Sequence, residues 1–297
     1  MLIANYCPTT EMMPLLGGKF CGTKRMSGFF LFERGVSFAP SFTKEDLDEL
    51  VQQGKAVGFI SPDSLADNNA DATFSETNTL VRNQTKSGRK GWTFSFYKSN
   101  CFQNELNKLN NSENWAIAPV LEDGSIVLWK SKNGNFFPFN AKTFVSIYNQ
   151  PILGGEDAGS TIEIDLVGSL DQWQNNGQTV AATDFEWNEV NPVAGLNIEV
   201  PVLVASATTT VVTIKNLCSS ATVSGLTTPA KWKMYRNGVS ESVSAVAENV
   251  ANQTYTFTHA ALVAADKIYF STEEDGLPIY VLDSAYYTGQ SATQIVA

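Results

Sequence analysis

The sequence predicts a mainly β protein, with an N-terminal antiparallel β-sheet or barrel-like domain and a C-terminal β-sandwich. Apolar and polar residues alternate in Trp92–Tyr97 and in Thr161–Val167, as expected for strands, whose side chains point alternately to two faces. Turn dipeptides such as Asn133-Gly134 and Asn237-Gly238 separate short apolar runs, which is typical of antiparallel hairpins. Helical spacing is clearest in Thr43–Gly54, so we expect only one or two short helices.

The N-terminal elements follow from this pattern. Thr43 is the expected N-cap of the helix, Asp46 its capping-box partner and Gly54 its C-terminal stop. A second short helix is expected over residues 102–109, and an irregular arm over the Pro- and Gly-rich first 22 residues. We predict strands at Met26–Phe32, Ala56–Ile60, Thr77–Thr85, Trp92–Tyr97, Trp115–Leu121, Ser125–Trp129, Phe136–Tyr148 and Thr161–Val167. We predict a polar loop at Ser61–Ser75, a flexible basic turn at Lys86–Gly91, a mobile loop at Gly154–Gly159 and a turn at Asn175–Gly177.

The composition shifts near Asn191-Pro192, which divides the 297 residues into a β-rich domain at 1–191 and a sandwich at 192–297. This division agrees with the usual domain size of ~100–200 residues. The second part is rich in Val, Ala, Thr and Ser, with short strands at the spacing of a sandwich. Its predicted strands are Glu199–Ala205, Thr209–Asn216, Lys231–Arg236, Ser242–Val246, Thr254–His259, Lys267–Ser271 and Ile279–Leu282.

The charge balance argues against a nucleic-acid binder. The chain has a net charge of −10, and residues 191–297, with 5 basic and 8 acidic residues, contribute −3 of it. Neither half is basic, whereas phosphate binding needs clustered Lys and Arg. Charged residues make up 17% of the chain, below the ~25% of ordinary soluble domains. Since interface cores are depleted of charge, repeated protein–protein contacts are expected to cover part of the surface.

Residues for enzymatic or metal chemistry are missing from the sequence. His259 is the single histidine, and the four cysteines form no CxxC pair, so we expect no zinc site, no Ser-His-Asp triad and buried, reduced thiols. Asp67-x-Asn69-x-Asp71 resembles the start of a calcium loop, but Ala72 and Asn78 stand where the Gly and Glu are needed. We therefore predict a non-enzymatic protein without a catalytic residue, metal or cofactor. The sequence also predicts no secretory signal and no membrane span.

The candidate subunit-contact segments are three polar loops, Asp67–Ser75, Lys86–Gly91 and Gly154–Gly159, because function often lies in loops. The alternative for each is an ordinary solvated loop. Tyr286 and Tyr287 are expected beyond the last strand, where they could contact a partner outside the assembly, whereas Trp232 is expected in the sandwich core. The candidate subunit-contact residues are Asp67, Asn69, Asp71, Lys86, Arg89, Lys90, Glu156 and Asp157.

Two segments of the C-terminal part resemble bacterial or phage immunoglobulin-like domains. They are Trp232–Gly238 and Leu262–Phe270, the second similar to the Leu-x-x-x-Asp-x-x-Tyr approach to the F strand. The cysteine pair of antibody domains is absent, with only Cys218 present in this part. The resemblance implies an immunoglobulin-like sandwich outside the antibody subclass.

The N-terminal part resembles structural proteins of tailed phages, particularly those that infect Bacteroidetes. The resemblance lies in Phe42-Thr43 at the helix start, the Asp/Asn-rich loop, Glu76-Thr77, the strand Trp92–Phe96 and the strand Glu163–Leu166. Tail-tube proteins of this kind have two antiparallel sheets, one flanking helix and long loops that reach neighbouring subunits.

The resemblance implies a virion protein assembled in the bacterial host cytoplasm. Its partners would be copies of itself, in rings that stack as a tail tube, and other virion proteins. The immunoglobulin-like domain would be displayed outward, and DNA could pass the lumen without specific binding. Three alternatives remain open: a neck, ring or capsid-decorating protein, a carbohydrate- or cell-surface-binding module, and an enzyme that uses carboxylates without histidine.

Overall fold

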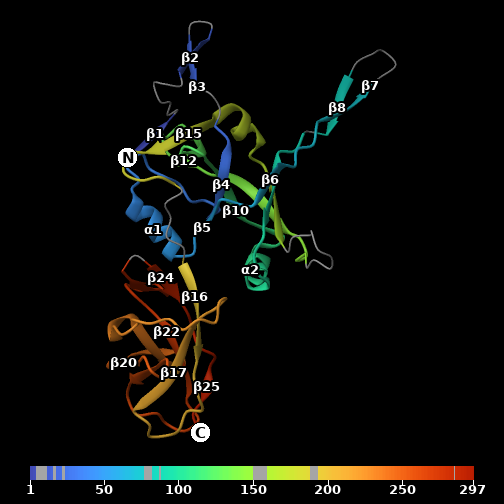
Figure 1. The fold of residues 1–297 in the computed structure, drawn as a ribbon. Coiled ribbons are helices and arrows are strands. Elements are labelled where there is room, and N and C mark those ends of the chain that lie inside the picture. Colours follow the sequence, from blue (N-terminus) through green and yellow to red (C-terminus); the bar gives the residue numbers. More distant parts are fainter. Residues whose placement is uncertain are drawn as a thin grey trace. The chain divides into compact units, whose positions relative to one another are not determined.

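The structure is a computed structural model that describes residues 1–4, 12–15, 18–21, 24–76, 82–86, 88–149, 159–187, 193–283 and 285–297 (Figure 1). It is mainly β, as predicted. The chain divides into two compact units, one of Met1–Asp48 with Lys55–Val190, and one of Asn191–Ala297 with Glu49–Gly54.

An eleven-stranded antiparallel sheet forms the N-terminal unit, with the strand order β1-β15-β11-β10-β13-β14-β9-β6. In addition, β12 pairs with β11, and β4 pairs with both β10 and β5. Because β10 pairs with three of its neighbours, the sheet branches there, and it curls into a half-barrel. The strands are β1 (Leu2–Ala4), β4 (Met26–Glu33), β5 (Ala56–Ile60), β6 (Ser64–Asp67), β9 (Gly91–Phe96), β10 (Ser112–Leu121), β11 (Ile126–Lys130), β12 (Phe136–Phe137), β13 (Phe139–Val145), β14 (Ser160–Leu166) and β15 (Gly177–Ala182).

Both faces of β4 are buried, which explains its unbroken apolar run. Phe29–Phe32 are fully buried, and successive side chains of a strand point to opposite faces. On one face the ring of Phe29 lies 4.0 Å from that of Phe94. On the other face the ring of Phe30 lies 6.1 Å from that of Trp187, edge to face. The core of this unit therefore lies on both sides of the same strand.

The predicted helices are confirmed. α1 (Lys44–Gln52) begins after Thr43, whose N–H donates to Asp46 Oδ2 at 2.9 Å. Gly54 follows the helix at φ +69°, in the left-handed region typical of a C-terminal stop. α2 (Asn100–Leu106) continues into a short 3₁₀ turn at Asn107–Leu109.

Three local predictions for this unit are wrong. The predicted loop Ser61–Ser75 contains β6 and most of β7 (Thr73–Glu76), and the end of the predicted strand at 77–85 lies in β8 (Arg82–Lys86). The predicted irregular N-terminal arm contains a hairpin of β2 (Met12–Leu15) and β3 (Gly18–Cys21). The predicted turn at 175–177 is the end of a π-helical turn, Gln172–Asn176, followed directly by β15. Polar composition misled the first of these predictions, because β6 and β7 are exposed throughout.

Two sheets form the C-terminal unit. The six-stranded sheet has the order β20-β21-β17-β16-β24-β23, and the four-stranded sheet has the order β19-β18-β22-β25. One buried apolar cluster takes side chains from both sheets, so the unit is a β-sandwich. The strands are β16 (Val193–Glu199), β17 (Thr209–Asn216), β18 (Trp232–Arg236), β19 (Val239–Ser242), β20 (Ala245–Asn249), β21 (Thr254–Thr258), β22 (Lys267–Thr272), β23 (Tyr280–Leu282), β24 (Ala285–Thr288) and β25 (Gln294–Ile295).

Two strand predictions in the sandwich are wrong. The strand predicted at Glu199–Ala205 ends at Glu199, just before Pro201, which has no N–H for a ladder. The strand predicted at Ser242–Val246 spans the step at which the chain leaves β19 in one sheet and enters β20 in the other. Alternation alone cannot reveal such a crossing, because the apolar spacing continues through it.

The cysteine prediction is also wrong where the structure tests it. Cys101 and Cys218 are both disulfide-bonded, and Cys218 is exposed rather than buried. Cys7 and the side chain of Cys21 lie outside the described residues.

Candidate assembly site

Two of the predicted contact segments are the two sides of one β-hairpin. β6 and β9 pair from Ser64↔Ser95 to Asp67↔Trp92. The same register continues through the bridge Ala70↔Arg89 and on to Thr73↔Lys86. It shifts at a bulge after Thr73, and the ribbon then runs to Glu76↔Arg82. We call the described residues 68–76, 82–86 and 88–90 the arm; Figure 1 shows its outer part, β7 and β8, beyond the end of β6.

Polar contacts join the root of the arm to β14. Arg89 donates from Nη2 to Asn68 Oδ1 at 3.0 Å, and its Nη1 lies 3.2 Å from Asp165 Oδ2. Asn68 in turn donates to Glu163 Oε2 at 3.3 Å. Burial raises the pKa of the Asp165 carboxyl above its ordinary value, while the Arg89 guanidinium acts in the opposite direction and Glu163 adds to the increase. The strand that ends in the arm is therefore tied to the sheet by side chains as well as by its ladder.

Lys90 makes the second ion pair of the root. Its Nζ lies 2.7 Å from Asp67 Oδ1 and 4.9 Å from the ring centre of Trp92, and Trp173 lies on its other side, at 5.8 Å. Cation–π contacts of this kind contribute about 0.5–1 kcal/mol at exposed sites. The ammonium group is held over the sheet instead of reaching into solvent.

Gly91 lies at a tightly packed point where the arm meets the sheet. Its N–H donates to Asn69 Oδ1 at 3.3 Å. A Cβ at this position would collide with Asp165 Oδ1 and would lie 3.0 Å from the carbonyl oxygen of Ile164. Because β9 approaches β14 closely at this point, a side chain would fit only if the Asp165 carboxylate moved.

The outer part of the arm buries none of its described side chains. All four residues of β7 are exposed, and so are residues 83–85 of β8. The hydroxyl groups of Thr73 and Thr85 lie 3.0 Å apart across the ribbon. A two-stranded ribbon without a covered face is marginally stable in water, so a second surface would stabilise the arm.

The sheet also ends at the arm. β6 is the terminal strand in the strand order, and no other described strand pairs with its outer edge. All four of its side chains are exposed, Leu65 included. Unpaired N–H and C=O groups on such an edge can pair with a strand of another chain.

The structure thus brings four of the predicted contact residues together at the arm root: Asp67, Asn69, Arg89 and Lys90. Asp71 is an exposed arm residue. Lys86 lies in β8 rather than in a flexible turn, and its side chain is outside the described residues. Glu156 and Asp157 also lie outside the described residues.

Tyr286 and Tyr287 lie in a strand, so their prediction beyond the last strand is wrong. β24 pairs with both β16 and β23. Both tyrosines are half-buried, and Tyr287 packs against the sandwich core. The last predicted strand, Ile279–Leu282, corresponds to β23, and the sequence analysis missed β24, which follows it closely and pairs with it as a short hairpin.

His259 is a packed residue. It is 5% exposed, its Nε2 lies 2.8 Å from Thr210 Oγ1 and its Nδ1 lies 2.8 Å from the Ala260 carbonyl oxygen. Within the described ranges, no three His, Cys, Asp or Glu side chains are grouped to hold a metal ion. Of the helices in this part of the chain, none has the length and apolarity to cross a membrane.

A comparison of the sequence with protein-family models found no match, and a comparison with curated proteins found no significant match.

Proposed function

We propose that the chain is a structural protein of a tailed-phage virion, which assembles with copies of itself into rings that stack as a tail tube. The arm is the observation that carries this proposal, because its outer side chains are exposed and its root is fixed to the sheet. A fixed root and an uncovered outer part are what a contact element needs to reach a neighbouring subunit. The terminal edge of β6 supports the same proposal, since edge pairing between neighbours would close a ring.

The strand order of the C-terminal sandwich supports an immunoglobulin-like domain displayed outside the tube. In an immunoglobulin sandwich, strands D, E, B and A lie side by side in one sheet, and C, F and G in the other. The order β20-β21-β17-β16 matches the first set, and β18-β22-β25 matches the second, with β19 in the place of C′. The hairpin β23–β24 is an addition between the strands equivalent to F and G.

The charge of the chain is compatible with a wall along which DNA passes. At a net charge of −10, the subunit would repel phosphate groups rather than bind them.

Removal of the arm tests the proposal. We would replace residues 71–88 by a two-residue Asn-Gly turn between Ala70 and Arg89, positions that already form a bridge. The wild-type chain and the variant would be compared by negative-stain electron microscopy and mass photometry over a concentration series. We expect rings or stacked tubes from the wild type, whose monomer has a mass of 32.3 kDa, and only the correspondingly lighter monomer from the shortened variant.

The matched control is a surface change away from the arm, Val250→Ser, at a side chain that is 73% exposed. It should assemble like the wild type. Thermal unfolding of all three proteins would establish that they are folded. A wild-type chain that stays monomeric at every concentration, or an armless variant that assembles normally, would refute the proposal.

A stacked tyrosine pair favours a second candidate, glycan binding by the sandwich. The rings of Tyr235 and Tyr269 are 4.6 Å apart and nearly parallel, at 5°, and both side chains are half-buried. The Tyr235 hydroxyl donates to Glu273 Oε2 at 2.8 Å, so the pair combines flat apolar surface with polar groups. Binding to immobilised glycans that is lost in Tyr269→Ala would support this function, and no binding by the wild type would exclude it.

A further inference from the structure

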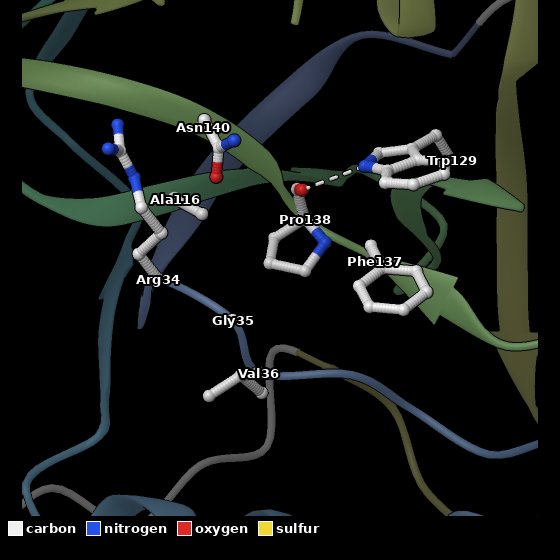
Figure 2. A pocket seen from close by; sticks show the side chains of 8 residues that line it. All are labelled: Arg34, Gly35, Val36, Ala116, Trp129, Phe137, Pro138 and Asn140. Carbon is white, nitrogen blue, oxygen red and sulfur yellow. Dashed lines mark hydrogen bonds between the residues drawn. The ribbon is translucent and has the colours of Figure 1, made fainter. Parts of the chain in front are cut away.

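A small cavity of about 190 Å³ lies in the N-terminal unit, and none of its lining residues belongs to the arm. Figure 2 shows Arg34 and Asn140 on one side, Trp129 and Phe137 on the other, Pro138 between them, and Val36 on the coil that follows Arg34 and Gly35. We call it the Arg34 pocket. Its residues come from the segment after β4, from β10, β11, β12 and β13, and from Pro138 between β12 and β13, so strands form half of its wall.

The aromatic side of the pocket is rigid. The rings of Trp129 and Phe137 stack at 4.8 Å with 21° between their planes. The indole Nε1–H of Trp129 donates to the Pro138 carbonyl oxygen at 3.1 Å. The indole is thus held by both a ring contact and a hydrogen bond, and it presents a preformed apolar surface.

The polar side carries an uncompensated positive charge. The guanidinium group of Arg34 has no hydrogen bond or ion pair with any residue that the structure describes, although its backbone N–H donates to the Asn114 carbonyl oxygen at 2.7 Å. Glu113 lies within electrostatic reach, but it is ion-paired with Lys142 at 3.0 Å. The Lys142 hydrogen bond is the main reason why the pKa of Glu113 is lowered, and Arg34 contributes least.

Asn140 adds an unused amide group. Its backbone carbonyl accepts from the Val167 N–H at 2.9 Å, while its carboxamide has no partner among the described residues. Both residues line the pocket, and a guanidinium and a carboxamide can each donate to a carboxylate.

We propose that the Arg34 pocket binds a carboxylate-bearing side chain of a second copy of this chain, an inference that rests on the proposed self-assembly. The cavity is smaller than the ~300–1,000 Å³ of small-molecule sites, so a single protruding side chain fits it better than a free ligand does. Trp and Arg in a preformed pocket are also typical of residues that dominate protein–protein binding energies.

Charge complementarity points to a second copy as the partner. The chain has 30 acidic against 20 basic residues, so any neighbouring copy presents excess carboxylates to an unpaired guanidinium. A phosphate-rich partner fits less well, because one arginine on a chain of net charge −10 gives little phosphate affinity.

A charge reversal at the pocket tests this proposal on the full chain. Arg34→Glu places two carboxylates opposite each other, and we expect the concentration for half-assembly to rise roughly 10- to 100-fold, as for loss of a close interfacial charge pair. Arg34→Lys should show a smaller increase, because it keeps the charge without the planar fork. The control is Lys98→Glu, which makes the same charge change at another exposed side chain of this unit and should leave assembly unchanged.

Sedimentation velocity would measure assembly, and circular dichroism would establish that each variant is folded. If the wild type assembles and Arg34→Glu assembles equally well, the pocket proposal is wrong while the assembly proposal stands. If the wild type never assembles, the assembly proposal fails and the pocket proposal fails with it. Saturable quenching of Trp129 in the monomer by N-acetylglutamate, without assembly, would assign the pocket to a small acid and also overturn the proposal.

Discussion

Trp232 is the residue on which the C-terminal core depends most clearly. It is fully buried, its Nε1–H donates to the Leu226 carbonyl oxygen at 3.0 Å, and its ring lies 4.9 Å from that of Phe257. The sequence placed it in the core because an aromatic residue on a central strand is typical of such sandwiches. Its buried N–H is satisfied by a loop carbonyl, which a sequence pattern does not reveal.

Trp232→Ala should destabilise the C-terminal unit by about 3–5 kcal/mol, because the substitution leaves a large cavity. Urea unfolding followed by circular dichroism would measure the change in the free energy of unfolding. Val239→Ala, at a side chain that is 66% exposed, is the comparison and should change it by less than about 0.5 kcal/mol. Similar losses in the two variants would contradict the central position of Trp232.

Tyr255 makes the stability of the same unit sensitive to alkaline pH. Burial raises the pKa of its hydroxyl to about 12 from 10.0, and the hydroxyl donates to the Val223 carbonyl oxygen at 2.7 Å. The folded state favours the protonated hydroxyl. The contribution of Tyr255 to the free energy of unfolding is therefore fully present below pH 10 and is lost as the pH rises through about 12.

In Tyr255→Phe the free energy of unfolding should therefore decrease less between pH 10 and 12 than in the wild type. This range lies between the ordinary and the raised pKa of Tyr255. At pH 7 the substitution should cost about 1–3 kcal/mol, because the Val223 carbonyl loses its donor. Denaturant midpoints across this pH range would measure both effects. An unchanged alkaline decline in the variant would exclude Tyr255 as its cause.

At the scale of elements, α1 shows how far a local signal determines a local structure. Thr43 and Asp46 form the capping contacts that the sequence predicts, and the helix buries the side chains of Leu47 and Val51. Thr43→Ala should destabilise the N-terminal unit by about 1 kcal/mol through loss of the cap. Thermal unfolding would measure this, and Thr73→Ala on the exposed arm should have no comparable effect.

The strands β9 and β14 pack tightly at Gly91, so a larger residue at this position should be destabilising. Gly91→Ala would push Asp165 away from Arg89 or separate the two strands. Added volume at a tightly packed site costs about 1–3 kcal/mol, and we expect the free energy of unfolding to fall by that amount in urea titrations. Thr85→Ala, on the exposed part of the arm, is the control, and equal stability of the two variants would contradict the close packing.

At the scale of the whole molecule, each unit has a core of its own. Two buried clusters draw on different ranges of the chain, one within residues 29–166 and one within residues 196–296. We therefore expect residues 191–297, expressed alone, to fold cooperatively as a sandwich. A dispersed amide NMR spectrum would support this expectation, and a spectrum typical of an unfolded chain would refute it.

The sequence by itself determined the mainly β class, the capped helix α1 and the strands with clean alternation. β14, β17 and the core position of Trp232 are examples. Each depends on interactions between residues close in the chain, or on a burial pattern that repeats along one strand. Such patterns can be recognised in the sequence without knowing which other strands or helices the segment packs against.

Only the tertiary structure decided that two polar segments separated along the chain form one arm. Asp67, Arg89 and Lys90 meet because β6 and β9 keep one register into the arm. Lys90 forms an ion pair with Asp67, and Arg89 forms one with Asp165 on a third strand. The Arg34 pocket likewise needs five segments to meet. Whether two distant strands pair depends on contacts between their side chains, and a pattern read along one segment contains no information on those contacts. For this reason the polar composition indicated loops where the fold has strands.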